Sequence, residues 1–217
     1  MSDVLYQIAS YMAFLPILIA AYRHKYLSKS LWWYAVGLLL ISICGIISIK
    51  LSEQRINNHF MIYINACSNI IIRSIFFYAF ITSKKHKNFL LIFLILFLLG
   101  VCMDICVHGI YMNQYLFMVI DVWASYFFLV CLNQILKDES IESLRNYPMF
   151  WVTIGTLMFV IFDFFLMVSN GWLYAVNRVF FFMLWDYITP IFMFIRIILV
   201  SIGYWKSKFH AENLANT

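Results

Sequence analysis

Long, nearly continuous apolar runs alternate with short polar stretches along this chain of 217 residues. A helix needs about 20 apolar residues to cross the hydrocarbon core of a bilayer, where its backbone groups must be bonded within the helix. Membrane β-strands instead alternate apolar and polar residues over about ten positions. The runs therefore predict seven transmembrane helices: Tyr6–Tyr22, Leu31–Ile49, Phe60–Ile81, Phe89–Val107, Tyr115–Leu136, Met149–Val168 and Phe181–Trp205.

The composition agrees with this pattern. Hydrophobic residues make up 65% of the chain and charged residues 12%, which is about half the charged share of an ordinary soluble domain. A water-soluble globule is thereby excluded, and the 20% aromatic content excludes a disordered chain. We expect an all-α integral membrane protein in which residues 1–217 form one seven-helix domain, with the lipid bilayer as its first partner.

Basic residues are distributed unequally between the two alternating sets of predicted loops. One set contains only Lys50, Arg55 and Arg178. The other contains Arg23, Lys25, Lys29, Lys84, Lys85, Lys87, Lys137, Arg145, Lys206 and Lys208. Because short cytoplasmic loops retain positive charge, we predict a multi-pass protein of a bacterial cytoplasmic (inner) membrane, with the N-terminus outside and the C-terminus inside. The net charge of +5 then reflects topology and requires no nucleic-acid partner.

Three pairs of predicted spans share short stretches of similar sequence. The run LWWYAVGLL at 31–39 aligns without a gap with MFWVTIGTL at 149–157, and Ala-Ser-Tyr occurs both at 9–11 and at 124–126. Arg73 and Arg196 lie at comparable places in the third and seventh spans. These matches suggest a parallel 3+1+3 arrangement, with half-repeats of residues 5–87 and 115–208 joined by the span at 89–107.

Six ionisable residues fall inside the predicted spans, where each costs free energy unless it is paired or solvated. They are Arg73, Asp104, Asp121, Asp163, Asp186 and Arg196. At ~1.5 Å per residue, the first three aspartates are expected roughly 21–23 Å from the inner ends of their spans, and the two arginines near ~13 Å. Asn65 and Asn69 precede Arg73 at four-residue intervals, so all three are expected on one helix face. We interpret this set as a polar core and a candidate ligand site.

Three interpretations of these charges are open. Each arginine could pair with an aspartate and only fix helix packing. Four aspartates against two arginines instead leave two surplus negative charges, which favours a polar outer vestibule that admits a ligand. Finally, some aspartates could lie close enough to the lipid headgroups to be plain interfacial groups.

Other chemistry has little support in the sequence. No catalytic motif is found, so we do not expect an enzyme, and we expect no cofactor. A retinal protein of this topology would need a lysine in the middle of the last span, whereas Lys206 lies at its end. The histidines lie at span ends, where only His59, His108 and Asp104 could meet a metal ion; no metal is expected.

The chain resembles a family of small bacterial seven-span integral membrane proteins. The residues that carry the resemblance are Pro-Met-Phe-Trp at 148–151 with Gly155, which open the sixth span, and Arg-Ile-Asn-Asn at 55–58, just before the third. By span layout it covers most of the chain. The resemblance implies a heptahelical, sensor-like module, supplies no assigned ligand, and does not extend to Asp163.

Two function classes follow. The first is a receptor-like or sensory module that binds a small molecule in an outward-facing polar pocket, moves the seventh span about Pro190, and signals to a separate cytoplasmic protein. The second is a small-solute transporter of 3+1+3 architecture, similar in span count to sugar or vitamin uniporters, in which Arg73 and Arg196 contact the substrate near the membrane midplane. A pocket above a tightly packed inner half would favour sensing, and a continuous cavity holding both arginines would favour transport.

Overall fold

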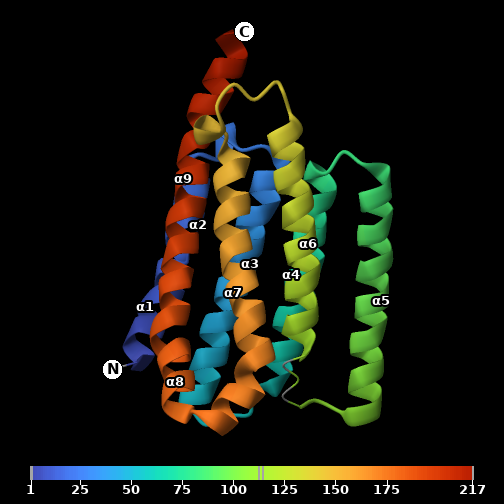
Figure 1. Ribbon diagram of the computed structural model, residues 1–217, viewed down its shortest axis with the longest axis vertical. Coiled ribbons are helices and arrows are strands. Elements are labelled where there is room, and N and C mark those ends of the chain that lie inside the picture. Colours follow the sequence, from blue (N-terminus) through green and yellow to red (C-terminus); the bar gives the residue numbers. More distant parts are fainter. Residues whose placement is uncertain (1, 112, 114, 217) are drawn as a thin grey trace.

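The computed structural model describes residues 2–111, 113 and 115–216, and its regular elements are all helical (Figure 1). In chain order the helices are α1 (Ser2–Met12), α2 (Phe14–Tyr22), η1 (His24–Tyr26), α3 (Lys29–Glu53), α4 (His59–Phe80), α5 (Lys84–His108), α6 (Tyr115–Lys137), η2 (Leu144–Asn146), α7 (Pro148–Val176), α8 (Arg178–Met183), η3 (Leu184–Ile188) and α9 (Thr189–Asn216). The expectation of an all-α protein is confirmed.

Six helical segments are long and apolar enough to cross a membrane, as a multi-pass membrane protein requires. They are α3, α4, α5, α6, the first 23 residues of α7, and the continuous segment Arg178–Phe209 formed by α8, η3 and most of α9. The first predicted span behaves differently, because it is divided into α1 and α2 at Ala13. Pro16 lies four residues after Met12 and has no N–H to donate to its carbonyl, which explains a break at this point. Seven spans remain a prediction.

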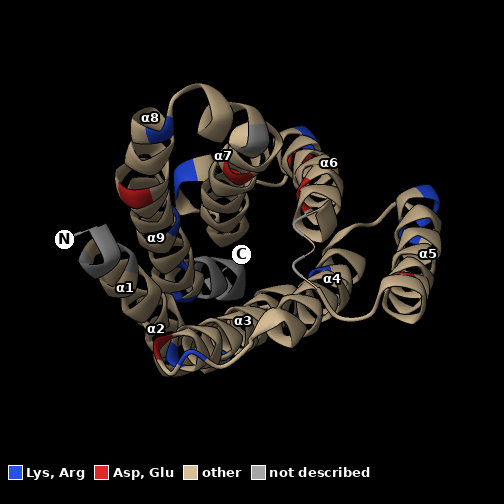
Figure 2. Cartoon of the chain, turned by 90° about the horizontal axis from the view of Figure 1, so that it is seen from below, with Lys and Arg blue, Asp and Glu red and all other residues tan. Residues whose placement is uncertain are grey.

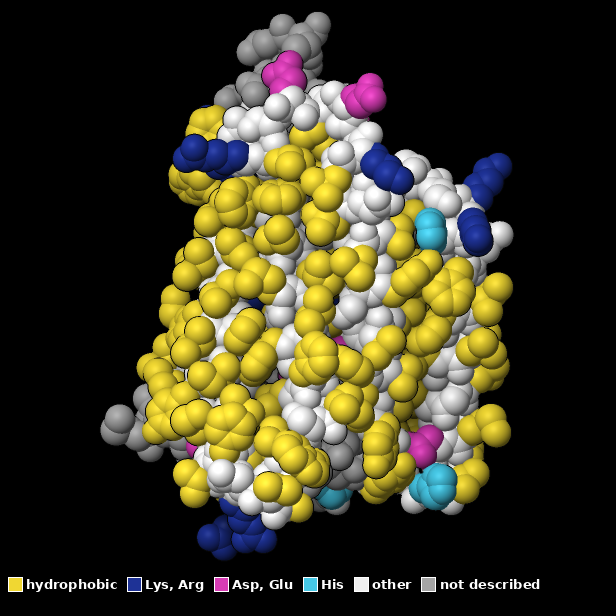
Figure 3. Space-filling model, viewed as in Figure 1, with side chains coloured by type: hydrophobic (Ala, Val, Ile, Leu, Met, Phe, Trp, Pro, Cys, Tyr) yellow, Lys and Arg dark blue, Asp and Glu magenta, His cyan; other side chains and the backbone are white. Residues whose placement is uncertain are grey.

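Successive long helices run in opposite directions, so the connections alternate between two ends of the bundle (Figure 1). We call the end with η1, η2 and the start of α5 the basic end, because the elements there carry the ten basic residues of the richer loop set. The opposite end carries α8 and the connection from α5 to α6. Hydrophobic side chains cover the visible face between them, and most of its Lys and Arg side chains lie at the basic end (Figure 3). This surface is typical of a membrane protein.

The main helix pairs are α7 with α9, α3 with α4 and α6 with α7, while α5 packs against α4 at the edge of the bundle (Figures 1 and 2). Two glycines permit the first two contacts. A Cβ atom at Gly37 of α3 would overlap Cγ2 of Ile72, and one at Gly155 of α7 would lie 2.7 Å from Cβ of Leu199. Small residues of this kind let membrane helices approach closely.

Packing is denser toward the basic end. The largest fully buried side chains, all but Ile120 in the basic half or near mid-length, are Tyr204, Phe76, Phe77, Phe127, Phe128, Ile70, Ile81, Leu90, Ile120, Ile135, Val152 and Val160. Phe77 contacts the rings of Phe76, Phe127 and Phe128 at centroid separations of 4.8–5.3 Å. These aromatic contacts fill the interior of the basic half with apolar side chains.

The last span contains the irregularity that the sequence leads one to expect. Residues 184–188 form the π-helical turn η3 directly before Pro190. The ring of Pro190 would clash with the carbonyl of residue 186 in a regular α-helix, and a π turn relieves that clash. The hydroxyl of Thr189 donates to the carbonyl of Leu184 at 3.2 Å, which satisfies a backbone oxygen at the irregular turn. The span thus has a deformable point close to Asp186.

Candidate polar site in the bundle interior

An ion pair in the bundle interior joins α4 to α6. Nη1 of Arg73 lies 3.9 Å from Oδ1 of Asp121, and both side chains are 7% exposed. This separation is too long for a hydrogen bond, and Nη1 of Arg73 and Oδ2 of Asp121 have no hydrogen-bond partner among the described residues. A buried pair held only by charge attraction is poorly compensated for its loss of water.

Asp163 of α7 and Arg196 of α9 complete a group of four charges, the interior quartet. Both arginines interact electrostatically with both Asp121 and Asp163. Asp121 and Asp163 also form a side-chain hydrogen bond with each other. The group contains two arginines and two aspartates, so the excess of aspartates over arginines expected from the sequence does not occur at this place. The reason is that the other two intramembrane aspartates lie elsewhere, as described below.

The predicted polar stripe on α4 faces the bundle interior. Asn69 is buried, and the carbonyl oxygens of Asn65 and Asn69 are both inaccessible and without a hydrogen-bond partner among the described residues. Their four-residue spacing continues to Arg73, so one face of α4 presents an amide, an amide and a guanidinium in sequence. Buried polar atoms are normally hydrogen-bonded, and several unpaired ones on one face are typical of a site that holds water or a ligand.

Two hydroxyl groups lie next to the quartet. Thr156 lies seven residues before Asp163, a spacing that predicts both on one helix face, whereas the sequence did not single out Tyr34. Tyr34 of α3 and Thr156 of α7 form a buried hydrogen bond between their side-chain oxygens. Tyr34 also interacts electrostatically with Arg73. Tyrosine is not ionised in an ordinary protein, so a search for charges inside apolar runs overlooks Tyr34. The sequence feature that could have pointed to both residues is the alignment of the runs 31–39 and 149–157, in which they lie.

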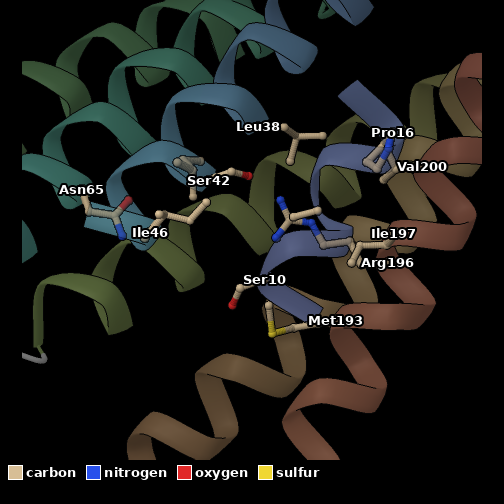
Figure 4. Close-up of a pocket in the computed structure, with 13 residues that line it drawn as sticks. Ser10, Pro16, Leu38, Ser42, Ile46, Asn65, Met193, Arg196, Ile197 and Val200 are labelled. Atoms are coloured by element: carbon tan, nitrogen blue, oxygen red, sulfur yellow. The ribbon is translucent and has the colours of Figure 1, made fainter. Parts of the chain in front are cut away.

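A cavity of about 170 Å³ lies between α1, α2, α3, α4 and α9. Its lining is mostly apolar and includes four polar side chains, Ser10, Ser42, Asn65 and Arg196. The guanidinium of Arg196 extends into the space between α2 and α3, with Asn65 on the far side (Figure 4). Arg196 also lies over the ring of Phe159, with its Cζ 5.0 Å from the ring centroid. Arg196 therefore joins the quartet to the cavity.

Asp104 belongs to a separate cluster at the opposite end of the bundle. Its carboxylate accepts hydrogen bonds from Tyr63 at 3.0 Å, from Asn113 at 2.8 Å and from Tyr111 at 3.1 Å. Nδ1 of His108 lies 3.1 Å from the same carboxylate. Partial burial and the bond to Asp104 raise the pKa of Tyr111 above its ordinary value. The cluster ties the end of α5 to α4 and to the following loop, which is a structural role.

Asp186 is also remote from the quartet. It lies on η3, which packs against α1, ten residues before Arg196 and therefore about 15 Å from it along the helix. Of the eight residues expected in the polar core, the structure thus gathers Arg73, Asp121, Asp163 and Arg196, extends that group through Asn65 and Asn69, and leaves Asp104 and Asp186 outside.

The possible surface metal site does not assemble in the described part of the chain. Asp104 contacts His108, but no group of three or more His, Cys, Asp or Glu side chains suited to a metal ion is found among the described residues. His108 instead contributes to the cluster around Asp104.

Comparisons of the chain with protein-family models, with curated proteins and with solved structures yield no match.

Proposed function

We propose that this protein is a receptor-like or sensory membrane module that binds a small molecule in the cavity at Arg196 and signals to a separate cytoplasmic protein. The observation that carries the proposal is that Arg196 both lines the cavity and belongs to the interior quartet. A ligand that attracts its guanidinium would weaken the hold of Asp121 and Asp163 on Arg196. Binding is thereby coupled to the packing of α6, α7 and α9.

The chemistry of the lining favours a small molecule with one anionic group and an apolar body. Arg196 is the one charged residue among the described residues that line the cavity, and most of the others are apolar. A cavity of roughly 150 Å³ accepts a benzene ring, so the space here suits a ligand of that size. A carboxylate could receive hydrogen bonds from the guanidinium, and Ser42 and Asn65 could bond its second oxygen.

The distribution of packing supports sensing over transport. Phe76, Phe77, Phe127 and Phe128 are buried in the basic half, and none of them lines the cavity. This packing favours a pocket above a filled inner half over a passage through the bundle. In our proposal the N-terminus lies outside and the basic end faces the cytoplasm of a bacterium. The deformable turn η3 before Pro190 allows α9 to shift, and the basic end presents the change to the partner protein.

A small-solute transporter of 3+1+3 architecture is the second candidate. The specific observation in its favour is that Gly37 and Gly155, which align in the two half-repeats, both lie at close helix contacts, between α3 and α4 and between α7 and α9. Equivalent contacts are expected if residues 5–87 and 115–208 are related by duplication. Transport would require the aromatic core of the basic half to open.

Binding of an anionic ligand at Arg196 can be tested with one pair of compounds. Benzoate and benzamide have nearly the same shape, and only benzoate carries a charge. We expect benzoate to raise the melting temperature of the purified protein in detergent, benzamide to have little effect, and Arg196→Gln to abolish the shift. Arg178→Gln is the matched control, because Arg178 lies at the opposite end over Tyr174 and does not line the cavity. Equal shifts for both compounds would contradict the proposal.

Flux measurements decide between sensing and transport. Protein reconstituted in liposomes and given labelled benzoate should show no uptake above empty liposomes if it is a sensor. Protein-dependent uptake that Arg196→Gln abolishes would favour the transporter.

A further inference from the structure

The edge helix α5 leaves an apolar groove open beside α6. The groove has a volume of about 660 Å³ and lies outside the interior quartet. Phe89 and Phe93 of α5 form one wall and Val119, Val122 and Trp123 of α6 the other. Phe89, Val119 and Val122 are substantially exposed. Such an open apolar surface on the perimeter of a membrane protein faces the hydrocarbon chains of lipids.

One end of this groove is basic and polar. Lys85 and His86 lie at its upper edge, near the start of α5, and no acidic side chain is among its described lining residues. Nδ1 of His86 lies 3.1 Å from the hydroxyl of Tyr126, which fixes the imidazole above the apolar walls. Positive charge at the membrane surface above an apolar channel complements an anionic headgroup above its acyl chain.

The length of the groove along the helices also suits a lipid, with a headgroup at one end and an acyl chain below it. From Lys85 to Phe93 on α5 is eight residues, and from Tyr126 to Met118 on α6 is also eight, which is about 12 Å of helix in each case. The groove therefore begins at the level of the headgroups and descends into the hydrocarbon region. Its volume lies within the range of roughly 300–1,000 Å³ that small-molecule sites have.

The alternative occupant, a second copy of this chain, fits less well. A two-fold axis along the membrane normal would place the same surface of both copies face to face. The lysines at the start of α5, Lys84, Lys85 and Lys87, would then lie at the same end of the interface in both copies. Like charges repel there, whereas an anionic lipid neutralises them.

We infer that the groove between α5 and α6 is a binding site for an anionic glycerophospholipid of the surrounding membrane, with the phosphate at Lys85 and His86 and an acyl chain against Phe89, Phe93 and Val122. The lipid fills the space between an edge helix and the rest of the bundle. It thereby holds α5, whose side-chain hydrogen bonds to other helices, among the described residues, lie near its two ends: His86 with Tyr126 at one end and Asp104 with Tyr63 at the other.

Native mass spectrometry of the purified protein tests this site. The protein in detergent is incubated with phosphatidylglycerol or with phosphatidylcholine of identical acyl chains. We expect the phosphatidylglycerol adduct to survive at higher collision energy and to be several times more abundant. Lys85→Gln should reduce this preference by about fivefold, the effect expected for one lysine near an anionic headgroup.

Two matched variants separate the groove from general electrostatic attraction. Lys87 carries the same charge near the same end of α5, but it lies over the ring of Tyr78 on the other side of the helix. Lys87→Gln should retain phosphatidylglycerol as the original chain does. Val122→Trp fills the groove and should reduce binding of both lipids, whereas Ile95→Trp, at an exposed position outside the groove, should not.

The inference is overturned if Lys85→Gln and Lys87→Gln lower binding equally, or if both lipids bind alike in every variant. A lipid-free dimer that Val122→Trp dissociates would also overturn it, because the groove would then hold a second copy. These outcomes do not depend on benzoate binding, so the lipid site and the proposed ligand cavity stand or fail separately.

Discussion

Arg73 and Asp121 form an ion pair across the interior of the bundle, with Nη1 and Oδ1 3.9 Å apart and both side chains almost completely buried. Each has a polar atom that makes no hydrogen bond with the described residues. The pair is thus close enough for charge attraction and too far apart for full hydrogen bonding. This arrangement makes the charges sensitive to any change at Arg196, the other cation of the quartet.

Removing one member of this pair should destabilise the protein strongly. Arg73→Gln leaves the carboxylate of Asp121 without its nearest cation, and breaking a buried pair in this way costs about 3–5 kcal/mol. Unfolding of the detergent-solubilised protein, followed by circular dichroism, measures the change. The double variant Arg73→Gln with Asp121→Asn should be more stable than the sum of the two single effects predicts, because it leaves no unpaired charge.

Lys50 and Glu53 provide the control for this experiment. They form an ion pair at 2.7 Å, but their side chains are 56% and 46% exposed. Replacing Lys50 by Gln should change the free energy of unfolding far less than Arg73→Gln does, since water compensates the remaining charge. Equal losses at Lys50 and Arg73 would show that the quartet is hydrated as freely as the surface.

The hydrogen bond between Tyr34 and Thr156 should contribute to the packing of α3 against α7. Tyr34→Phe removes one hydroxyl and leaves the other buried without this partner, so we expect a loss of about 1 kcal/mol in unfolding free energy. Adding Thr156→Val should recover part of that loss. Tyr22→Phe is the control, because Tyr22 is 73% exposed and its hydroxyl remains accessible. A loss for Tyr22→Phe as large as for Tyr34→Phe would contradict the assignment.

Gly155 should tolerate no side chain. A methyl group there would lie 2.7 Å from Cβ of Leu199 and would force α7 and α9 apart. We expect Gly155→Ala to lower the unfolding free energy by about 1–3 kcal/mol, the usual cost of overpacking. Gly100→Ala on α5 is the comparison, since no atom lies within 4 Å of a Cβ at that position and alanine favours the helix. Thermal unfolding of both variants checks the prediction. Equal melting temperatures for Gly155→Ala and Gly100→Ala would contradict it.

Asp104 should hold the end of α5 and the loop that follows it. Asp104→Asn keeps the shape of the side chain and removes the charge that accepts bonds from Tyr63, Tyr111 and Asn113. We expect faster amide hydrogen exchange over residues 100–111, with little change in the exchange of α7 and α9. Hydrogen exchange followed by mass spectrometry measures these rates. If exchange became faster in all helices alike, Asp104 would stabilise the whole bundle and not the end of α5 in particular.

The sequence predicted the positions of most helices well and some of their ends poorly. The runs at 60–81, 89–107 and 115–136 correspond closely to α4, α5 and α6, because a length of apolar residues is a local property. Pro16 divided the first run, and Val168 did not end the sixth, since α7 continues to Val176. Ser-Asn-Gly at 169–171 is a sequence that often ends a helix, but α7 passes through it and continues over the mostly apolar residues up to Val176.

The candidate site was predicted by residue type and corrected by geometry. Periodicity placed Asn65, Asn69 and Arg73 on one face of α4, and the structure directs that face inward. A rise of ~1.5 Å per residue separated the arginines from the aspartates into two layers. The structure places Arg73 beside Asp121 across these two layers, which is the contact that the first of the three open interpretations expected for an arginine.

The sequence alone determined that this is a helical, membrane-type chain with long apolar spans and a basic end, because the length of an apolar run and the position of a charge do not depend on neighbouring segments. Only the tertiary structure decided which charges meet. Asp104 and Asp163 are the same residue type inside apolar runs, yet one is bonded to Tyr63 and Asn113 near an end of the bundle and the other faces two arginines in its interior. Helix order and rotation set that difference, and both are fixed by packing between segments far apart in the chain, such as Gly155 against Leu199.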